Sequence, residues 1–183
     1  MNRLGIKFFT HATTFDNENG VSTGSLDVPI SPLGKRQIVN LHEAIRKDVF
    51  HKVFSSDLVR ALQTAKGALG DRYEIMTDAR LREINIGDLS GQLDSFTGPL
   101  SSEYIDKPYP NGESYDDVEI KMRSFLKNAV EQNPNGRIAI FAHQAPQLAL
   151  EVITKNLSWK EAMNNDWRNS GSFQYGWEYV YEG

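Results

Sequence analysis

The sequence contains no cysteine. This absence excludes disulfide bonds, a thiol nucleophile and a thiolate metal site. The chain also has no apolar run long enough to span a membrane, and the apolar stretch near its N-terminus is too short for a signal peptide. We therefore expect a cytoplasmic protein without a membrane partner.

Neither sign of charge dominates the chain. There are 20 lysines and arginines against 24 aspartates and glutamates, for a net charge of −4. The two signs are interspersed, which disfavours a nucleic-acid partner. A hydrophobic content of 39% is ordinary for a globular protein. Without repeats or linker-like segments, residues 1–183 are expected to form a single domain, whose oligomeric state stays open.

Short apolar runs alternate with helical patterns along the chain. The strands are expected at 4–10, 53–55, 73–77, 138–142 and 172–181. Helices are expected to begin at Ser31 with Pro32 in the first turn, at Asp57 as an N-cap, at a capping box over Ser114–Asp117, and at Gln144. This alternation predicts an α/β fold, a three-layer sandwich whose mostly parallel central sheet is flanked by helices. The irregular stretches 16–31 and 88–112 are long enough to be functional loops.

Only four histidines occur, and two of them directly follow apolar runs. His11 follows the first expected strand and His143 follows the most apolar one. Ligands bind beyond the carboxyl ends of the strands in parallel sheets, so both positions suit chemistry. The alternative is that both are structural histidines at strand ends.

Five short motifs follow one another in a defined order. They are His11 with Asn17 six residues later, the block SSDLVRALQTA at 55–65, LREINIG at 81–87, Gly112-Glu113-Ser114, and His143. Together they resemble the histidine phosphatase superfamily, which has the phosphoglycerate-mutase-like fold. The resemblance covers nearly the whole chain, and the block at 55–65 is its most specific part.

The resemblance implies catalytic roles for three residues. His11 matches the nucleophile, and a neutral imidazole can attack phosphorus and carry the phosphoryl group. Glu83 matches the acid that protonates the leaving group, although it could instead form a surface salt bridge with Arg80 or Arg82. His143 matches the second histidine, which contacts the phosphate.

The resemblance also implies a set of phosphate-binding groups. Arg60 matches a phosphate arginine, whose guanidinium can donate to two oxygens at once. Asn17 and the backbone around Thr23 and Gly24 match the positions that line the phosphate loop. The alternatives are a solvated helix residue for Arg60 and a turn residue for Asn17.

The chain departs from the family pattern at three places. Thr10 replaces the arginine before the nucleophile, Ala12 replaces a glycine, and Gln144-Ala145 stands where two glycines are common. Thr10 removes a cationic donor from the expected phosphate site, and no replacement is evident in the sequence. Gln144 could offer its side-chain amide, or its backbone N–H at a helix N-terminus.

The reaction class follows from the charge near the acid motif. The resemblance implies that a mutase carries extra basic residues after this motif, whereas residues 92–110 contain one lysine and no arginine. We therefore predict a phosphatase that cleaves a small-molecule phosphomonoester through a phosphohistidine intermediate, without a cofactor. His11, Glu83 and His143 follow no metal motif, and no metal is expected. The alternatives are a weakened or non-catalytic relative that binds a phosphorylated or anionic ligand, and a phosphoglycerate-mutase-type phosphotransferase.

Overall fold

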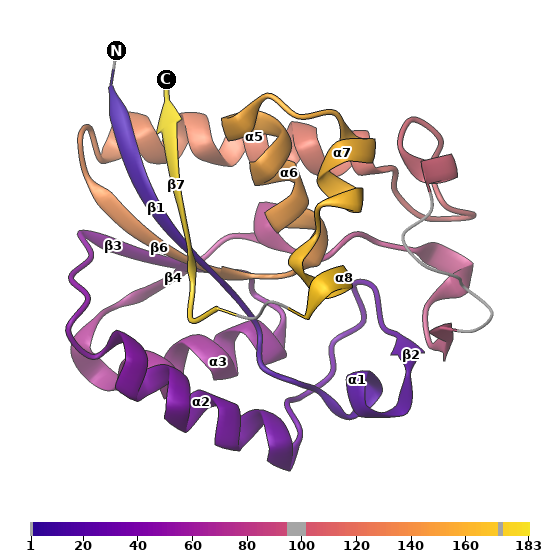
Figure 1. The fold of residues 1–183 in the computed structure, drawn as a ribbon, viewed down its shortest axis with the longest axis horizontal. Coiled ribbons are helices and arrows are strands. Elements are labelled where there is room, and N and C mark those ends of the chain that lie inside the picture. Colours follow the sequence, from indigo (N-terminus) through magenta and orange to yellow (C-terminus); the bar gives the residue numbers. More distant parts are fainter. Residues whose placement is uncertain (1, 95–101, 172–173) are drawn as a thin grey trace.

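A five-stranded sheet forms the centre of the structure, a computed structural model that describes residues 2–94, 102–171 and 174–183 (Figure 1). The strand order is β4-β3-β6-β1-β7. The strands are β1 (Arg3–Thr10), β3 (Lys52–Ser55), β4 (Ile75–Thr77), β6 (Arg137–Ala142) and β7 (Trp177–Glu182). All neighbours pair in parallel except β7, which runs antiparallel to β1. The mostly parallel sheet predicted from the sequence is therefore confirmed.

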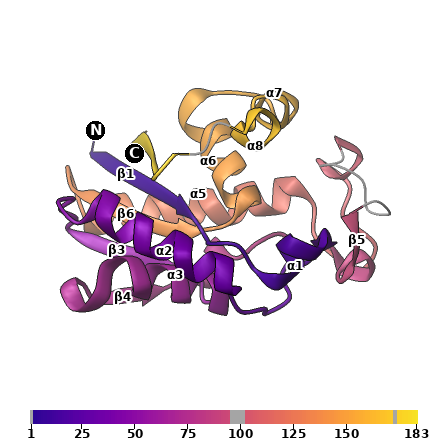
Figure 2. The same ribbon diagram turned by 60° about the horizontal axis from the view of Figure 1, so that its bottom comes forward.

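Helices cover both faces of the sheet, which gives the predicted three layers (Figure 2). The long helices are α2 (Pro32–Ile45), α3 (Val59–Leu69), α5 (Tyr115–Gln132) and α6 (Gln144–Lys155). The short ones are α1 (Phe15–Asn19), α7 (Trp159–Asn164) and α8 (Trp167–Ser170), and a small ribbon pairs β2 (Val21–Ser22) with β5 (Gln92–Leu93). None of the helices in the described ranges is long and apolar enough to cross a membrane.

Alternate side chains of the central strands enter two different cores. Phe8 packs on the side of α5 and α6, whereas Phe9 packs on the side of α2 and α3 and stacks on Phe141 with ring centroids 4.6 Å apart. Both phenylalanines are almost fully buried. Because successive side chains of a strand point to opposite faces, β1 contributes to the packing of both helical layers against the sheet.

Three helix starts agree with the sequence, and one of them is the start of α6 at Gln144. The Ser31 hydroxyl accepts a hydrogen bond from the Gly34 backbone N–H at 3.2 Å, and Pro32 occupies the first turn. Ser114 and Asp117 form the expected capping box of α5. Gly34 itself is required by close packing, since a Cβ there would lie 2.2 Å from the Thr13 carbonyl oxygen.

The prediction that Asp57 caps α3 is wrong. The helix begins at Val59 after Leu58, which provides no side-chain cap. Asp57 instead forms a two-pronged ion pair with Arg82, at 2.7 and 2.6 Å. Such charge-assisted bonds are stronger than a neutral cap, and Asp27 accepts the Val59 backbone N–H in its place.

The extent of the last strand also differs from the prediction. It begins at Trp177, because Gly176 has φ +102° and interrupts the extended backbone before it. The expected strand residues Ser172 and Phe173 lie outside the described residues. The strand expected at 73–77 is shorter in the structure, where β4 spans Ile75–Thr77. The stretch expected as a loop at 16–31 contains most of α1 together with β2.

The sheet register brings the two histidines of interest together. Thr10 at the end of β1 pairs with Ala142 at the end of β6, and the His11 backbone N–H donates to the Ala142 carbonyl at 3.0 Å. His11 and His143 therefore follow adjacent parallel strands at the same edge of the sheet. This is the edge at which ligands bind in α/β proteins.

Candidate active site

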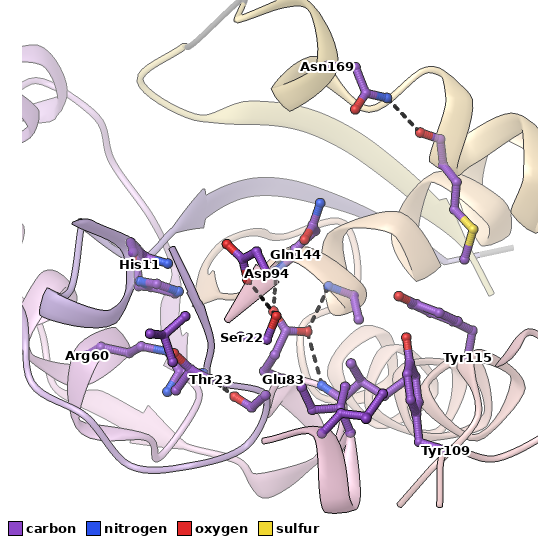
Figure 3. Close-up of a pocket in the computed structure, with 18 of the residues that line it drawn as sticks. His11, Ser22, Thr23, Arg60, Glu83, Asp94, Tyr109, Tyr115, Gln144 and Asn169 are labelled. Carbon is purple, nitrogen blue, oxygen red and sulfur yellow. Dashed lines mark hydrogen bonds between the residues drawn. The ribbon is translucent and has the colours of Figure 1, made fainter. Parts of the chain in front are cut away.

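A cavity of about 650 Å³ opens at the carboxyl ends of β1 and β6 (Figure 3). It collects side chains from separate parts of the chain. His11, Asn17, Thr23, Gly24, Arg60, Glu83 and Gln144, all predicted site residues, line it. The cavity is larger than a phosphate group needs and leaves room for an organic substituent.

His11 is held in the form that a nucleophile requires. Its Nδ1 lies 2.8 Å from the Ala12 carbonyl oxygen. A carbonyl can only accept, so Nδ1 carries the proton and the lone pair resides on Nε2. Burial, the Arg60 charge and, to a lesser degree, the Arg168 charge lower the pKa of His11 from 6.5 to about 3. His11 is thus a neutral imidazole at neutral pH, which is the nucleophilic form.

His143 lies beside His11 but deeper in the protein. The two ring centroids are 5.1 Å apart, and His143 is fully buried at the N-terminus of α6. It does not line the cavity directly. Neither ring nitrogen has a hydrogen-bond partner among the described residues. Burial lowers its pKa well below the usual value, assisted by the charges of Arg60 and of His11.

Arg60 is buried rather than solvated, so the solvated-helix alternative is wrong. Its two terminal nitrogens donate to the backbone carbonyls of Leu26 and Gly24 at 2.7 and 2.8 Å. Its Nε has no partner among the described residues. Burial lowers the pKa of Arg60, opposed by nearby acids of which Glu83 contributes most.

Gly24 is required for this arrangement. Its φ of +53° favours glycine, and a Cβ would lie 2.7 Å from Cγ1 of Ile86. The left-handed backbone allows the carbonyl of Gly24 to accept from Arg60. The predicted loop glycine thus helps to position the arginine guanidinium.

Glu83 binds the N-terminus of α6 and pairs with neither arginine suggested by the sequence. Its carboxylate accepts the backbone N–H groups of Gln144, Ala145 and Ile84, each at 3.0 Å. Arg82 pairs with Asp57 and Arg80 pairs with Asp78. Dashed lines in Figure 3 mark bonds that hold the Glu83 carboxylate inside the cavity.

Gln144 and Thr10 differ from their expected geometry. The Gln144 amide nitrogen donates to Asp166 at 2.6 Å, and its backbone N–H donates to Glu83, so neither is directed to a free phosphate site here. Thr10 is partly buried and does not line the cavity. A threonine side chain at position 10 is too short to reach the place that the guanidinium of an arginine could occupy.

Asn17 and Thr23 are fixed by local hydrogen bonds. The Asn17 carbonyl oxygen accepts from the backbone and hydroxyl of Thr14, in a capping box at the start of α1. Asn17 is therefore a capping residue as well as a cavity residue. The Thr23 hydroxyl donates to Asp16 at 2.8 Å.

Several cavity residues were not predicted from the sequence. They are Val21, Ser22, Ile84, Ile86, Leu89, Asp94, Tyr109, Tyr115, Ala145, Met163, Asn164 and Asn169. Tyr109 and Tyr115 flank the Gly112-Glu113-Ser114 motif, which is a signal that could have found them. The residues around α7 and α8 carry no such signal. Burial raises the pKa of both tyrosines, which therefore remain protonated hydroxyls.

The motif order, the paired histidines and the buried arginine can be compared with known proteins. A family model described as "Histidine phosphatase superfamily (branch 1)" matches residues 6–172. The chain belongs to the histidine phosphatase superfamily. The resemblance inferred from the five motifs is therefore confirmed.

Curated relatives of this histidine phosphatase chain carry phosphatase and mutase names. "Putative phosphoserine phosphatase 2" of Hydrogenobacter thermophilus is 29% identical over 88% of this chain and 83% of its own length. "Phosphoglycerate mutase-like protein 4" of Arabidopsis thaliana is 30% identical over 73% of this chain and 63% of its own. The names of the relatives therefore cover two reaction classes, phosphate ester hydrolysis and phosphoryl transfer by mutases.

Solved structures agree with the fold. A mycobacterial glucosyl-3-phosphoglycerate phosphatase in complex with VO3 superposes with a TM-score of 0.74, at 26% identity, over 90% of this chain and 85% of that one. YhfR of Bacillus stearothermophilus reaches a TM-score of 0.78 at 22% identity, covering 87% and 83% of the chains, and shows the shared fold.

The low pKa of His11 predicts a pH dependence of folding stability. The unfolded chain binds a proton at His11 below pH 6.5, whereas the folded chain does so only near pH 3. Stability from this group is therefore present above pH 6.5 and is lost as the pH falls toward 3. Between pH 7 and pH 5 the loss is about 2 kcal/mol.

Urea unfolding at pH 7 and at pH 5 measures this effect. The free energy of unfolding of the His11→Ala variant should decrease less between the two pH values than that of the parent chain. An equal decrease in the two proteins would show that the fold does not hinder protonation of the His11 ring.

Proposed function

We propose that this protein hydrolyses a small-molecule phosphomonoester through a phosphohistidine at His11. The observation that carries the proposal is the group of unpaired polar atoms next to Glu83. Nε2 of His11 carries a lone pair, and the ring nitrogens of His143 and Nε of Arg60 lack partners within the described residues. A phosphate group has the charge and the acceptors to satisfy donors of this kind.

The first step forms a bond from Nε2 of His11 to phosphorus while the bond from phosphorus to the leaving oxygen breaks. Glu83 gives its proton to the leaving oxygen, so that an alcohol departs. Arg60 and His143 stabilise the charge on the remaining phosphoryl oxygens. For this step Glu83 must enter protonated, and its position in the same cavity as His11 supports the role.

The second step returns the enzyme to its starting state. Water attacks phosphorus, Glu83 takes a proton from that water, and the bond between phosphorus and Nε2 breaks. Inorganic phosphate leaves, and His11 is again a neutral imidazole. The products are one alcohol and one phosphate for each ester and water consumed.

The charge lining the cavity favours hydrolysis over phosphoglycerate-mutase-type transfer. A mutase must hold a second acidic group of its substrate. Arg60 is the single cationic side chain lining the cavity in the described ranges, and the undescribed residues 95–101 and 172–173 contain no lysine or arginine. The phosphatase names among the relatives also support this choice.

The proposal is tested with an aryl phosphate in the presence of a metal chelator. We expect steady release of phosphate and competitive inhibition by vanadate. If no aryl or alkyl phosphate is cleaved while vanadate or phosphate still raises the melting temperature, the protein is a non-catalytic binder. The loss of positive charge at Thr10 is the observation that favours this second candidate.

We expect Thr10→Arg to strengthen vanadate binding. A hydrogen bond from a charged donor contributes roughly 1.5–3 kcal/mol against about 1 for a neutral one. The difference corresponds to roughly a five- to thirty-fold gain in affinity. The gain should appear in vanadate inhibition and in kcat/KM. A Thr10→Arg chain that folds normally but binds vanadate no tighter would contradict it.

Arg168 is a second cation near His11, and its removal can be compared in the parent and Thr10→Arg chains. Trp177 pairs with Phe8 of β1 and stacks on Trp167 with centroids 4.9 Å apart, which places α8 beside the end of β1. The charge of Arg168 also acts on His11. We expect Arg168→Ala to weaken vanadate binding in the parent chain and to do so less in the Thr10→Arg background. Arg82→Ala, at an arginine paired outside the cavity, is the control.

A further inference from the structure

Four amide side chains line the cavity, those of Asn17, Gln144, Asn164 and Asn169. For Asn17, Gln144 and Asn169, the hydrogen-bond partners fix which end faces a ligand. Amide oxygen and nitrogen look alike in shape, so only the hydrogen-bond network assigns them. The Asn17 oxygen accepts from two Thr14 groups, which leaves its nitrogen as the donor available to a ligand. This donor suits the phosphate end of the cavity.

Gln144 has the opposite orientation. Its partner Asp166 is buried and forms an ion pair with Arg168 at 2.8 Å, so the Asp166 carboxylate is an acceptor only. The amide nitrogen of Gln144 must therefore point to Asp166, where the distance is 2.6 Å. The carbonyl oxygen is the end of Gln144 that a ligand can meet.

Asn169 lies in α8, the helix whose N-cap is Asp166, and repeats this arrangement. Its amide nitrogen donates to the backbone carbonyls of Met163 and Asn164, at 3.0 and 3.3 Å. Both partners are obligate acceptors, so the amide cannot be reversed. Figure 3 shows Asn169 above Gln144, with a dashed line at the Asn169 amide. The free end of Asn169 is again a carbonyl oxygen.

Acidic side chains add to the acceptor oxygens that Gln144 and Asn169 present to the cavity. Asp94 and Glu83 line the cavity as acids, while Arg60 already donates to two backbone carbonyls. A second anionic group on a ligand would meet acceptor oxygens and the Asp94 carboxylate, with no further cation among the described lining residues. A hydroxyl or ammonium group would meet hydrogen-bond acceptors. Like charges in a partly desolvated cavity are costly.

We propose that the leaving group of the substrate is a neutral or cationic alcohol with hydrogen-bond donors, which Gln144, Asn169 and Asp94 recognise through their oxygens. This inference rests on the proposed phosphatase function and specifies its substrate class. Gln144 and Asn169 act as specificity residues. Asp166 positions Gln144 by accepting from its amide.

Matched pairs of esters test the proposal. Glycerol phosphate carries a CH2OH group where 3-phosphoglycerate carries a carboxylate. We expect a kcat/KM for glycerol phosphate at least about tenfold higher than for 3-phosphoglycerate. Glycerol phosphate and propyl phosphate differ only in hydroxyls. Here we expect an advantage of about fivefold or more for glycerol phosphate, equivalent to one neutral hydrogen bond.

A charge introduced at Asn169 gives the second measurement. Asn169→Lys places a cation on the cavity wall and should raise the relative kcat/KM for 3-phosphoglycerate about fivefold or more. Ser170→Lys adds the same charge one residue away, outside the residues that line the cavity, and should leave the ratio at the parent value. Both positions are exposed, so both chains are expected to fold.

The outcomes separate this inference from the proposed function. Equal turnover of the esters, or a preference for 3-phosphoglycerate, would overturn the inference while the phosphatase function stands. An equal change of the kcat/KM ratio in both lysine variants would also overturn it. The preference would then not depend on a charge at the residue that lines the cavity. Cleavage of none of the esters or of the aryl phosphate would overturn both.

Discussion

Replacing His11 with alanine should abolish turnover while the chain still folds. His11 is the group with a free ring nitrogen at the carboxyl end of β1, and its proton is held on the far nitrogen by the Ala12 carbonyl. Removing a nucleophile costs on the order of 10⁴–10⁶ in kcat in enzymes with covalent intermediates. Aryl and alkyl phosphates should lose activity alike, because both need the same attacking atom.

Chemical trapping identifies the intermediate directly. Labelled ester mixed with the parent protein and quenched rapidly in base should leave label on the protein. The linkage should be stable in base and labile in acid, as expected of a phosphohistidine. His11→Ala should retain no label. The control is His51→Ala, at an exposed histidine far from the cavity, which should be labelled like the parent.

Two results would contradict the role of His11. Turnover retained in His11→Ala would exclude it as the nucleophile. Label that survives on the His11→Ala chain would place the phosphoryl group elsewhere, and His143 is the neighbouring candidate. A melting curve of the variant separates loss of chemistry from loss of fold.

The parts of the site that lie in sequence-local patterns were predictable. His11 and His143 each end an apolar strand, and parallel strands bring their carboxyl ends to one edge. Strand–helix alternation likewise predicted the layers, because the periods of two and 3.6 are properties of short segments. The capping residues Ser31 and Ser114 act within one helical turn and were equally readable.

The parts that depend on long-range partners were not predictable. Asp57 was expected to cap a helix, but Arg82, distant in sequence, pairs with it. The direction of the Gln144 amide depends on Asp166, 22 residues later in the chain. Asn169 lines the cavity from a four-residue helix that has no apolar period. A sequence pattern does not contain these choices, because each is decided by which groups the fold brings together.

Glu83→Gln should lower activity strongly for substrates with poor leaving groups and weakly for aryl phosphates. An alkoxide must be protonated as it departs, whereas a phenolate departs with little help. General acid catalysis contributes roughly 10²–10⁴ in rate, so we expect losses of that size for glycerol phosphate. For a nitrophenyl phosphate the loss should be below about tenfold. The measurement is kcat/KM over a series of esters with graded leaving-group pKa.

The hydrogen bonds of Glu83 define the structural effect that this experiment must separate from chemistry. Glutamine can keep the acceptor oxygen that binds the Ile84 and Ala145 N–H groups, but its amide nitrogen cannot accept from Gln144. A modest loss of stability is therefore expected, and Glu83→Ala, which removes every one of these acceptors, should lose more. If Glu83 only held the start of α6 in place, the activity of both variants would follow the melting temperature equally for all esters. A rate that depends steeply on the leaving group in Glu83→Gln, and much less in the parent, requires instead that the carboxyl group of Glu83 delivers the proton.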